Sequence, residues 1–307
     1  MEIITNIDTL LPVPTVATIG SFDGVHRGHV AMIAEARALA AERGLPLTVI
    51  TFAIHPRQFF NPRQEPFLLS SFNDKLLLLE QCGVDRCVLL PFGRSMAALS
   101  AREFMSSILR DKLSVKLLAV GYDHRFGTPC KGECVKQYIE YGNEFGIEVL
   151  PMAPYLPNSE KISSSEVRRS LAAGDVVAAA AILGRRYSIC GTVVHGAALG
   201  RSLGFPTANI ALDEPLQMLP LDGVYECRVI IDSLEYSGVM NVGKKPTLGG
   251  DERTIEVFIL DFKKDIYNDK VCVEFVRRIR DERSFLSLDA LRRQIEADVQ
   301  EVIKNRE

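Results

Sequence analysis

The hydrophobic pattern of this chain changes near residue 184, and no other feature restricts the fold as strongly. In the first half, short runs rich in β-forming residues alternate with segments of helical spacing. Strands that alternate with helices predict βαβ units and a parallel sheet covered by helices. The predicted strands cover residues 15–19, 46–52, 85–90, 116–120 and 147–152.

The second half consists mostly of short strands separated by turn residues. Short strands at regular spacing predict an antiparallel barrel or sandwich. They cover residues 187–194, 223–232, 237–243, 254–262 and 270–279. The segment 287–304 then returns to helical spacing, with Ser287 as a plausible N-cap.

A chain of 307 residues is long enough for two domains of about 100–200 residues each. We therefore predict an α/β protein with two domains. Residues 1–184 form the parallel-sheet domain. Residues 185–307 form the antiparallel barrel, which ends in a long helix.

Composition excludes several classes of partner. The net charge of −3 gives no broad basic field for nucleic acid. No apolar run approaches the roughly 20 residues that cross a bilayer, and the N-terminal segment lacks the pattern of a signal peptide. The cysteines are odd in number, seven, and none form a CxxC pair, which predicts free thiols and a cytoplasmic protein. The oligomeric state cannot be read from these features.

Unusual polar clusters follow four of the predicted strands in the first half. They are "GSFDGVHRGH" (20–29), "AIHPRQFF" (53–60), "GYDHRFG" (121–127) and "ISSSEVRR" (162–169). Ligands of open α/β sheets bind beyond the carboxyl ends of the strands. We therefore expect these clusters to converge on one crevice.

The residue types in these clusters suit a nucleotide. Gly20, Gly24 and Gly28 allow close approach to a phosphate, and the helix that begins near residues 26–28 favours an anion at its N-terminus. His26 and His29 lie on one helical face and can donate to phosphate oxygens. Taken singly, a histidine pair or a serine-rich turn is as often an ordinary helix start. Four such clusters at strand ends favour a binding site.

The first of these motifs resembles the signature of the nucleotidyltransferase superfamily, whose core is HxGH. The longer form, together with "ISSSEVR" downstream, resembles the adenylyltransferase half of the bacterial riboflavin kinase/FAD synthetase family. HxGH alone would also fit pantetheine-phosphate adenylyltransferases and cytidylyltransferases.

The second half contains a glycine-rich loop followed by "PTAN". Thr207 and Asn209 present a hydroxyl and an amide oxygen on one side of an extended chain. Both are ligands that a nucleotide-bound Mg²⁺ accepts. Gly196 and Gly200 mark the loop before them. The residues alone leave open a tight barrel turn with a rigid Pro206.

Glu256 is the second candidate in this half. In a strand it points the same way as Phe258 and Leu260. A carboxylate on an apolar face can act as general base toward an alcohol. The alternative is an edge strand whose glutamate faces water.

Together these residues resemble the riboflavin kinase domain. "GRSLGFPTAN", "GVYECRV", "VGKKPT", "IEVFILDF" and "FLSLDALRRQI" occur in the family's order. With the first half, the resemblance covers nearly the whole chain. It implies a Rossmann-like nucleotidyltransferase domain and a riboflavin kinase barrel. It also implies phosphorylation of riboflavin to FMN with ATP, followed by adenylylation of FMN to FAD.

The resemblance also implies roles for individual residues. For the kinase, Glu256 accepts the hydroxyl proton, Thr207 and Asn209 hold Mg²⁺, and the loop with Gly196 and Gly200 covers the phosphates. The flavin pocket is closed by the segment around Arg280, Arg283 and Phe285.

For the adenylyltransferase, His26 and His29 stabilise the developing charge. The expected nucleotide, phosphate and FMN contacts are Gly20, Phe22, Asp23, Gly24, Ser164, Ser165, Arg168, Asp123 and Phe126, with Phe59 as a further aromatic wall for the flavin.

Some positions depart from the commoner pattern of the family: His124, Ser165, Val167 and the loop 195–201. These positions concern the FMN pocket and the loop contacts. Two other hypotheses remain at this point. One is an enzyme with a single active half, and the other is a flavin-binding module without turnover. The presence of Thr207, Asn209 and Glu256 argues against the first. The presence of His26, His29 and Glu256 argues against the second.

Overall fold

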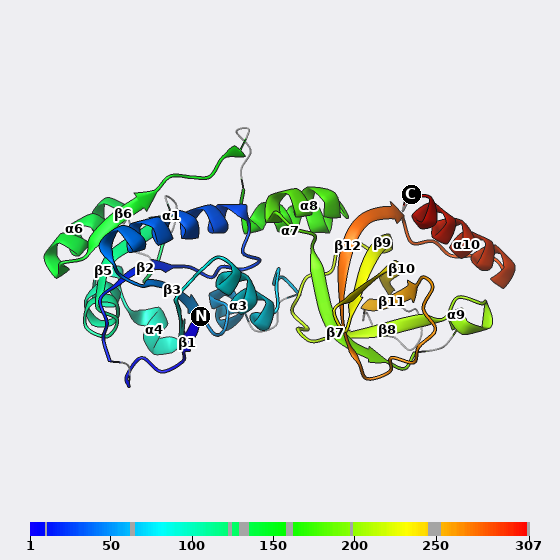
Figure 1. The fold of residues 1–307 in the computed structure, drawn as a ribbon, viewed down its shortest axis with the longest axis horizontal. Coiled ribbons are helices and arrows are strands. Elements are labelled where there is room, and N and C mark those ends of the chain that lie inside the picture. Colours follow the sequence, from blue (N-terminus) through cyan, green and yellow to red (C-terminus); the bar gives the residue numbers. More distant parts are fainter. Residues whose placement is uncertain are drawn as a thin grey trace. The chain divides into compact units, whose positions relative to one another are not determined.

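The computed structural model describes residues 1–9, 11–61, 65–121, 125–128, 135–157, 162–196, 199–244 and 253–305 (Figure 1). The chain forms two compact units. The first comprises Met1–Gln64 and Phe72–Ile162, and the second comprises Glu65–Ser71 and Ser163–Glu307.

The first unit is built on a six-stranded sheet in the order β1-β4-β3-β2-β5-β6. Every pair of neighbouring strands is parallel, as the sequence predicts. The strands are β1 (Glu2–Ile4), β2 (Thr15–Ile19), β3 (Leu47–Phe52), β4 (Arg86–Leu90), β5 (Val115–Gly121) and β6 (Glu148–Met152). The edge strand β1 is new, because three residues are too few to show a pattern.

Helices cover both faces of this sheet because successive strand residues point to opposite sides. Ile33 of α1 and Leu79 of α3 pack with Val16 and Val49 on one face. Phe104 packs with Ala17 on the other. The helices are α1 (Arg27–Arg43), α2 (Pro56–Phe60), α3 (Phe72–Gln81), α4 (Arg94–Ala98), α5 (Ala101–Phe104), the π-helical η1 (Met105–Arg110) and α6 (Val135–Phe145).

The second unit is a closed antiparallel barrel with strand order β10-β11-β8-β7-β12-β9. This closure decides between the barrel and the sandwich. The strands are β7 (Ser188–Val194), β8 (Thr207–Leu212), β9 (Gly223–Ile231), β10 (Leu234–Lys244), β11 (Arg253–Ile259) and β12 (Lys270–Arg280). Its helices are α7 (Ser164–Ala172), α8 (Val176–Leu183), α9 (Leu199–Ser202) and, near the end of the chain, α10 (Leu288–Lys304).

The barrel core extends beyond the strands. Val167 and Leu171 of α7 and Ala179 of α8 belong to the same buried cluster as Ile189 and Val229 of the barrel. Residues 65–71 join the unit as well, since the backbone N–H groups of two of them donate to the Leu216 carbonyl at 2.8 and 2.9 Å.

One prediction about the cysteines was wrong. Cys190 and Cys272 form a disulfide rather than free thiols. They are partners in the antiparallel register of β7 and β12, although 82 positions separate them in sequence. Only the barrel register brings them together, so their spacing could not reveal the bond. Cys82, Cys87 and Cys227 are free.

Within the described ranges, no helix is both long and apolar enough to cross a membrane.

Candidate active sites

His26 and His29 are held together at the start of α1. His26 is the N-cap, and its Nδ1 accepts a hydrogen bond from the His29 backbone N–H at 3.3 Å. The two imidazole rings are stacked, with their centroids 3.7 Å apart. The capping interaction therefore fixes the pair at the positive end of a 17-residue helix, where an anion is favoured.

The loop before α1 is a tight support for this pair. Gly24 has a φ of 75°, a conformation that favours glycine. Phe22 also has a positive φ, 49°, and its side chain is fully buried with one edge against the His29 ring, 5.1 Å between centroids. Gly20 lies against the Phe22 ring. The Phe22 side chain therefore supports the His29 ring, and its expected contact with a ligand stays a prediction.

Lys75 on α3 is a residue that the sequence analysis missed. Its Nζ donates to the carbonyl of Phe52, at the end of β3, at 3.1 Å. Burial lowers the pKa of Lys75, and the charges of Asp23 and Cys87 act in the opposite direction. Asp23 itself is 3% exposed. A half-buried lysine thus lies at the end of β3, and a single lysine before a leucine run gave no signal for it.

Aromatic side chains gather where β3 and β4 end. The Phe92 ring has edge contacts with Phe52, Phe59 and Phe60 at centroid distances of 5.2, 5.5 and 5.8 Å. Phe60 is 69% exposed. This cluster offers apolar surface to a planar ligand and includes the expected Phe59.

Phe126 has a different environment. It is 8% exposed and stacks on Tyr138, with 4.4 Å between the centroids, beside Phe104 at 5.5 Å. It belongs to the core of the first unit. Asp123, the other residue expected to meet FMN, lies outside the described residues.

The serine cluster starts α7, which belongs to the second unit. Ser163 is the N-cap, and its Oγ accepts from the Glu166 backbone N–H at 3.3 Å. Ser164 and Ser165 form the first turn. Arg168 donates through Nε to the carbonyl of Phe67 at 2.8 Å. The expected grouping of these residues with His26 and His29 therefore joins parts of different units.

Thr207 and Asn209 are alternate residues of β8 and share one face, as expected. In the barrel register Asn209 pairs with Glu256, and Thr207 pairs with Phe258. The candidate metal ligands and the candidate base thus lie on neighbouring strands, about 5 Å apart at the Cβ level.

The glycines of the preceding loop approach these ligands closely. A Cβ atom at Gly196 would clash with the Asn209 side chain, and one at Gly200 would lie 3.3 Å from Thr207 Oγ1. Glycine at both positions lets the loop backbone lie against Thr207 and Asn209, which fits the expected cover over the site.

Glu256 faces a cavity of about 420 Å³, here called the Glu256 cavity. Phe258 lines the same wall, so the predicted shared face is confirmed. Because β11 lies between β10 and β8 in a closed barrel, the edge-strand alternative is wrong. The cavity is also lined by Thr207, Val224, Val239, Asn241, Arg280, Glu282, Arg283, Phe285 and Asp298.

Arg280 and Phe285 reach this cavity as expected, but Arg280 is heavily engaged. Its Nε donates to both carboxylate oxygens of Asp298 at 3.0 Å, and its Nη2 donates to one of them at 2.8 Å. Its Nη1 donates to the Asp281 carbonyl at 3.0 Å. The Phe285 ring lies 5.8 Å from the guanidinium. Arg280 therefore forms part of the cavity wall, and most of its N–H groups donate to Asp298 and Asp281 rather than to a ligand.

A second cavity of about 410 Å³, here called the Tyr267 cavity, was not anticipated. It shares Thr207 with the Glu256 cavity. Its cationic residues are Arg201, Lys263 and Lys264, and its aromatic residues are Phe262 and Tyr267. The sequence of this region was interpreted only as a turn, so its chemistry was missed.

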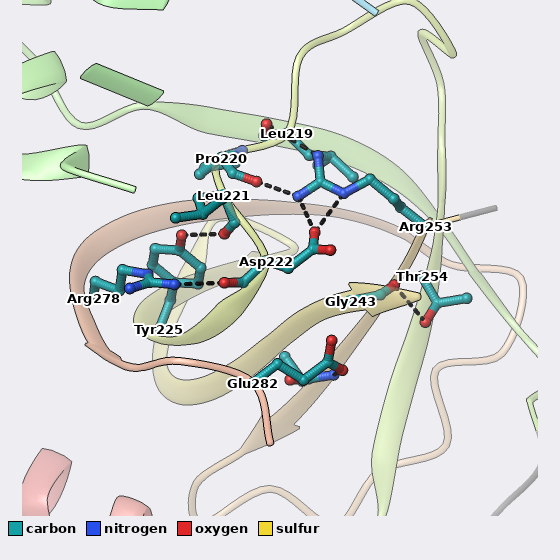
Figure 2. A network of polar contacts seen from close by, with 11 residues as sticks. Leu219, Pro220, Leu221, Asp222, Tyr225, Gly243, Arg253, Thr254, Arg278 and Glu282 are labelled. Carbon is teal, nitrogen blue, oxygen red and sulfur yellow. Dashed lines mark hydrogen bonds and ion pairs between the residues drawn. The ribbon is translucent and has the colours of Figure 1, made fainter. Parts of the chain in front are cut away.

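A polar network holds the backbone beside the Glu256 cavity (Figure 2). Arg253 donates to Asp222 Oδ1 at 2.7 Å, to the Leu219 carbonyl at 3.2 Å and to the Pro220 carbonyl. Arg278 Nη2 donates to the Asp222 carbonyl at 2.5 Å. The network fixes the loop before β9 to the start of β11 and to β12.

The donor set fits a nucleotide-bound Mg²⁺. In the described part of the chain, no three His, Cys, Asp or Glu side chains form a cluster that could hold a metal ion. Thr207 and Asn209 supply two oxygen ligands, and Mg²⁺ usually takes few protein ligands beside phosphate oxygens and water.

Comparisons with known proteins agree with this division. Residues 10–166 match the family model for FAD synthetase, and residues 183–305 match the one for riboflavin kinase. This protein therefore belongs to the class of chains that contain an FAD synthetase domain followed by a riboflavin kinase domain.

Full-length relatives narrow the class. The bifunctional riboflavin kinase/FMN adenylyltransferase of Escherichia coli K12 is 38% identical over 302 residues, which is 97% of this chain and 96% of the relative. The Pseudomonas fluorescens protein of the same name is 41% identical over 286 residues, covering 92% and 90%. This chain belongs to the family of bifunctional riboflavin kinase/FMN adenylyltransferases.

A solved structure from Streptococcus pneumoniae, titled as a macrolide-efflux protein, has the same fold. It is 33% identical with a TM-score of 0.87, and 97% of each chain is covered.

Proposed function

We propose that this chain phosphorylates riboflavin to FMN with ATP in its barrel, and adenylylates FMN to FAD in its parallel-sheet unit. The main supporting observation is the position of Glu256. It faces a cavity with apolar and charged lining residues and pairs in register with Asn209, while Thr207 borders both this cavity and a second, cationic one.

In the kinase reaction, riboflavin occupies the Glu256 cavity. Glu256 accepts the proton of the ribityl 5′-hydroxyl as its oxygen attacks the γ-phosphorus of ATP, and ADP leaves. The apolar residues Val224, Val239 and Phe258 suit the flavin ring. Arg280 and Phe285 complete the wall.

ATP occupies the Tyr267 cavity in this proposal. Aromatic side chains there suit a purine, and Arg201, Lys263 and Lys264 favour the phosphates. Thr207, common to both cavities, marks the point where the phosphoryl group passes. Thr207 and Asn209 would hold a Mg²⁺ ion, which neutralises phosphate charge when bound.

In the adenylyltransferase reaction, an FMN phosphate oxygen attacks the α-phosphorus of ATP, and pyrophosphate leaves. His26 and His29, at the start of α1, stabilise the negative charge that develops. The aromatic cluster with Phe59 and Phe60 is the better-exposed wall for the flavin ring.

The phosphate-binding roles of Gly20, Gly24, Ser164, Ser165 and Arg168 belong to the same proposal, as does the FMN contact of Asp123. For the catalytic domains we propose residues 1–184 and 185–307. The riboflavin kinase match begins at residue 183, while the FAD synthetase match ends at 166 and the main segment of the second compact unit begins at Ser163. A cytoplasmic location and the absence of a nucleic-acid partner complete the proposal, the latter supported by the net charge of −3.

A product assay tests both halves. Purified protein is mixed with riboflavin, ATP and Mg²⁺, and the flavins are separated over time. FMN that appears first and FAD that follows are the expected result. FMN alone would remove the adenylyltransferase proposal, and FAD from FMN but not from riboflavin would remove the kinase proposal. No conversion of either flavin would overturn both.

A further inference from the structure

A row of polar side chains crosses the wall of the Glu256 cavity. Asn241 on β10 is the register partner of Glu256 on β11, and Glu256 is the register partner of Asn209 on β8. Opposed residues of antiparallel strands project to the same face with Cβ atoms about 4.5–5.5 Å apart. Asn241 and Glu256 accordingly line the same cavity.

Glu282 extends this row from the segment that follows β12. Asn241 Nδ2 donates to Glu282 Oε1 at 3.4 Å, and Glu282 also lines the cavity. Its carboxylate lies against Gly243, where any Cβ atom would clash with it. Figure 2 shows Glu282 beside Gly243 of β10. The order along the wall is therefore carboxylate, amide, carboxylate.

The order of these groups has a chemical meaning, although the cations Lys244, Arg280 and Arg283 also line the cavity. The carboxylate oxygens accept hydrogen bonds from hydroxyl groups, and the amide can both accept and donate them. A ligand whose carbon chain carries several adjacent hydroxyls can bind such a row, because each hydroxyl can donate to a carboxylate oxygen or bond to the amide between the carboxylates. Glu256 serves the terminal hydroxyl in the proposed kinase reaction, which leaves Asn241 and Glu282 for its neighbours.

We propose that Asn241 and Glu282 bind the secondary hydroxyls of the ribityl chain and so set the specificity of the kinase for a polyol substrate. This inference rests on the proposed kinase function. Of the three cations that line the cavity, Arg280 directs its guanidinium to Asp298 and the Asp281 carbonyl; the other two are Lys244 and Arg283.

The test compares a flavin that has the polyol chain with one that lacks it. In the full-length protein, riboflavin serves as the kinase substrate, and lumiflavin, with a methyl group in place of the chain, serves as a competitive inhibitor. For Glu282→Gln and Asn241→Leu we expect the KM for riboflavin to rise about tenfold, because a hydrogen bond to each hydroxyl is weakened or lost. The Ki of lumiflavin stays unchanged.

A third variant moves the carboxylate without changing it. Gly243→Ala displaces Glu282, because the new Cβ atom occupies its place. We expect the same selective rise in KM. Glu235→Gln is the matched control: Glu235 also lies on β10, but it pairs with Arg228 at 3.2 Å and is exposed. It should change neither constant. Urea unfolding of the second unit in the same preparations reports that each variant is folded.

Each outcome of these measurements either supports or overturns the inference. A parallel loss of affinity for riboflavin and lumiflavin would mean that the row only shapes the cavity, and unchanged constants in all three variants would mean that it contacts no hydroxyl. Either would overturn this inference and leave the kinase function standing. An unaltered chain that does not phosphorylate riboflavin would overturn the function itself, and this inference with it.

Discussion

Glu256 is the residue on which the kinase half of the proposal depends. Glu256→Gln keeps the size of the side chain but removes the oxygen that accepts the proton. We expect FMN formation from riboflavin to fall by about 10²- to 10⁴-fold, the usual contribution of a positioned general base. Flavin chromatography measures it.

The matching control is the second reaction of the same variant. Conversion of added FMN to FAD should proceed at the rate of the unaltered chain, because Glu256 and His29 belong to different compact units. A fall in both reactions would show that the substitution damages the fold instead of the base.

Cys87 gives a prediction about alkaline pH. Burial raises the pKa of this thiol from 9.0 to about 11, with the charge of Lys75 acting against the rise. The unfolded chain loses this proton near pH 9 and the folded chain near pH 11, so the stability that the neutral thiol contributes is present below pH 9 and is lost as the pH rises to 11. The loss amounts to about 2–3 kcal/mol.

Urea unfolding of the unaltered chain and of Cys87→Ala between pH 8 and pH 11, under reducing conditions, measures this effect. The variant should lose less stability over this range (a prediction from the linkage above). Two curves that stay parallel up to pH 11 would show that Cys87 does not control the alkaline slope.

At the residue scale, the sequence pattern predicted the direction of a side chain better than it predicted which residues surround that side chain. The shared face of Glu256 and Phe258 followed from strand alternation alone. The burial of Phe22 and Phe126 depends on rings from distant segments, such as Tyr138 against Phe126, and no local pattern encodes it. The row of Asn241 and Glu282 depends on barrel register, which a single sequence does not give.

A buried ion pair joins helix α10 to β12. Asp298 of α10 is 3% exposed and Arg280 of β12 is 12% exposed, and Gln294 adds a hydrogen bond to Asp298 at 2.8 Å. Removing one partner leaves the other charge buried, which costs about 3–5 kcal/mol. We therefore expect Asp298→Ala to destabilise the second unit by this amount, measured by chemical denaturation.

Asp281 provides the comparison for this pair. It forms an ion pair with Arg278, but its side chain is 82% exposed. Asp281→Ala should cost less than about 1 kcal/mol, as exposed pairs do. Equal losses in the two variants would contradict the role assigned to burial.

Strands β7 and β12 are also joined covalently. The Cys190–Cys272 bond closes a long loop. In the chain-entropy model, a cross-link over 82 residues lowers the entropy of the unfolded chain and so stabilises the fold by about 4.5 kcal/mol. We expect reduction to lower the melting temperature of the second unit. The denatured chain should expose two more thiols after reduction than before.

The double variant Cys190→Ser/Cys272→Ser should melt at the same temperature with and without reductant. An equal thiol count before and after reduction of the unaltered chain would contradict the bond.

At the element scale, the five predicted strands of the first half match β2 to β6 within a residue at each end, and the helix after "GSFDGVHRGH" ends at Gly44 as its C-cap. The helix that begins at Ala101 changes to π-helical hydrogen bonding at Met105. Residues 65–71 pack with the barrel although they interrupt the first unit in sequence. Both features depend on tertiary contacts, so the periodicity of the sequence could not predict them.

At the scale of the whole chain, the two proposed reactions share an intermediate but not their catalytic groups. His26 and His29 lie in the first unit, and Glu256, Thr207 and Asn209 lie in the second. FMN is the product of one reaction and the substrate of the other. If it leaves the barrel as a free molecule, the two units need not belong to the same chain to act in sequence.

Mixing two inactive variants tests this directly. His29→Ala should convert riboflavin to FMN and stop, and Glu256→Gln should convert only added FMN to FAD. We expect a mixture of the two to form FAD from riboflavin after a lag, during which free FMN accumulates, and the lag should lengthen on dilution. Failure of the mixture, with each variant retaining its own reaction, would mean that FMN is handed on within one chain. The prediction that FMN diffuses between chains would then be wrong, while the assignment of one reaction to each unit would stand.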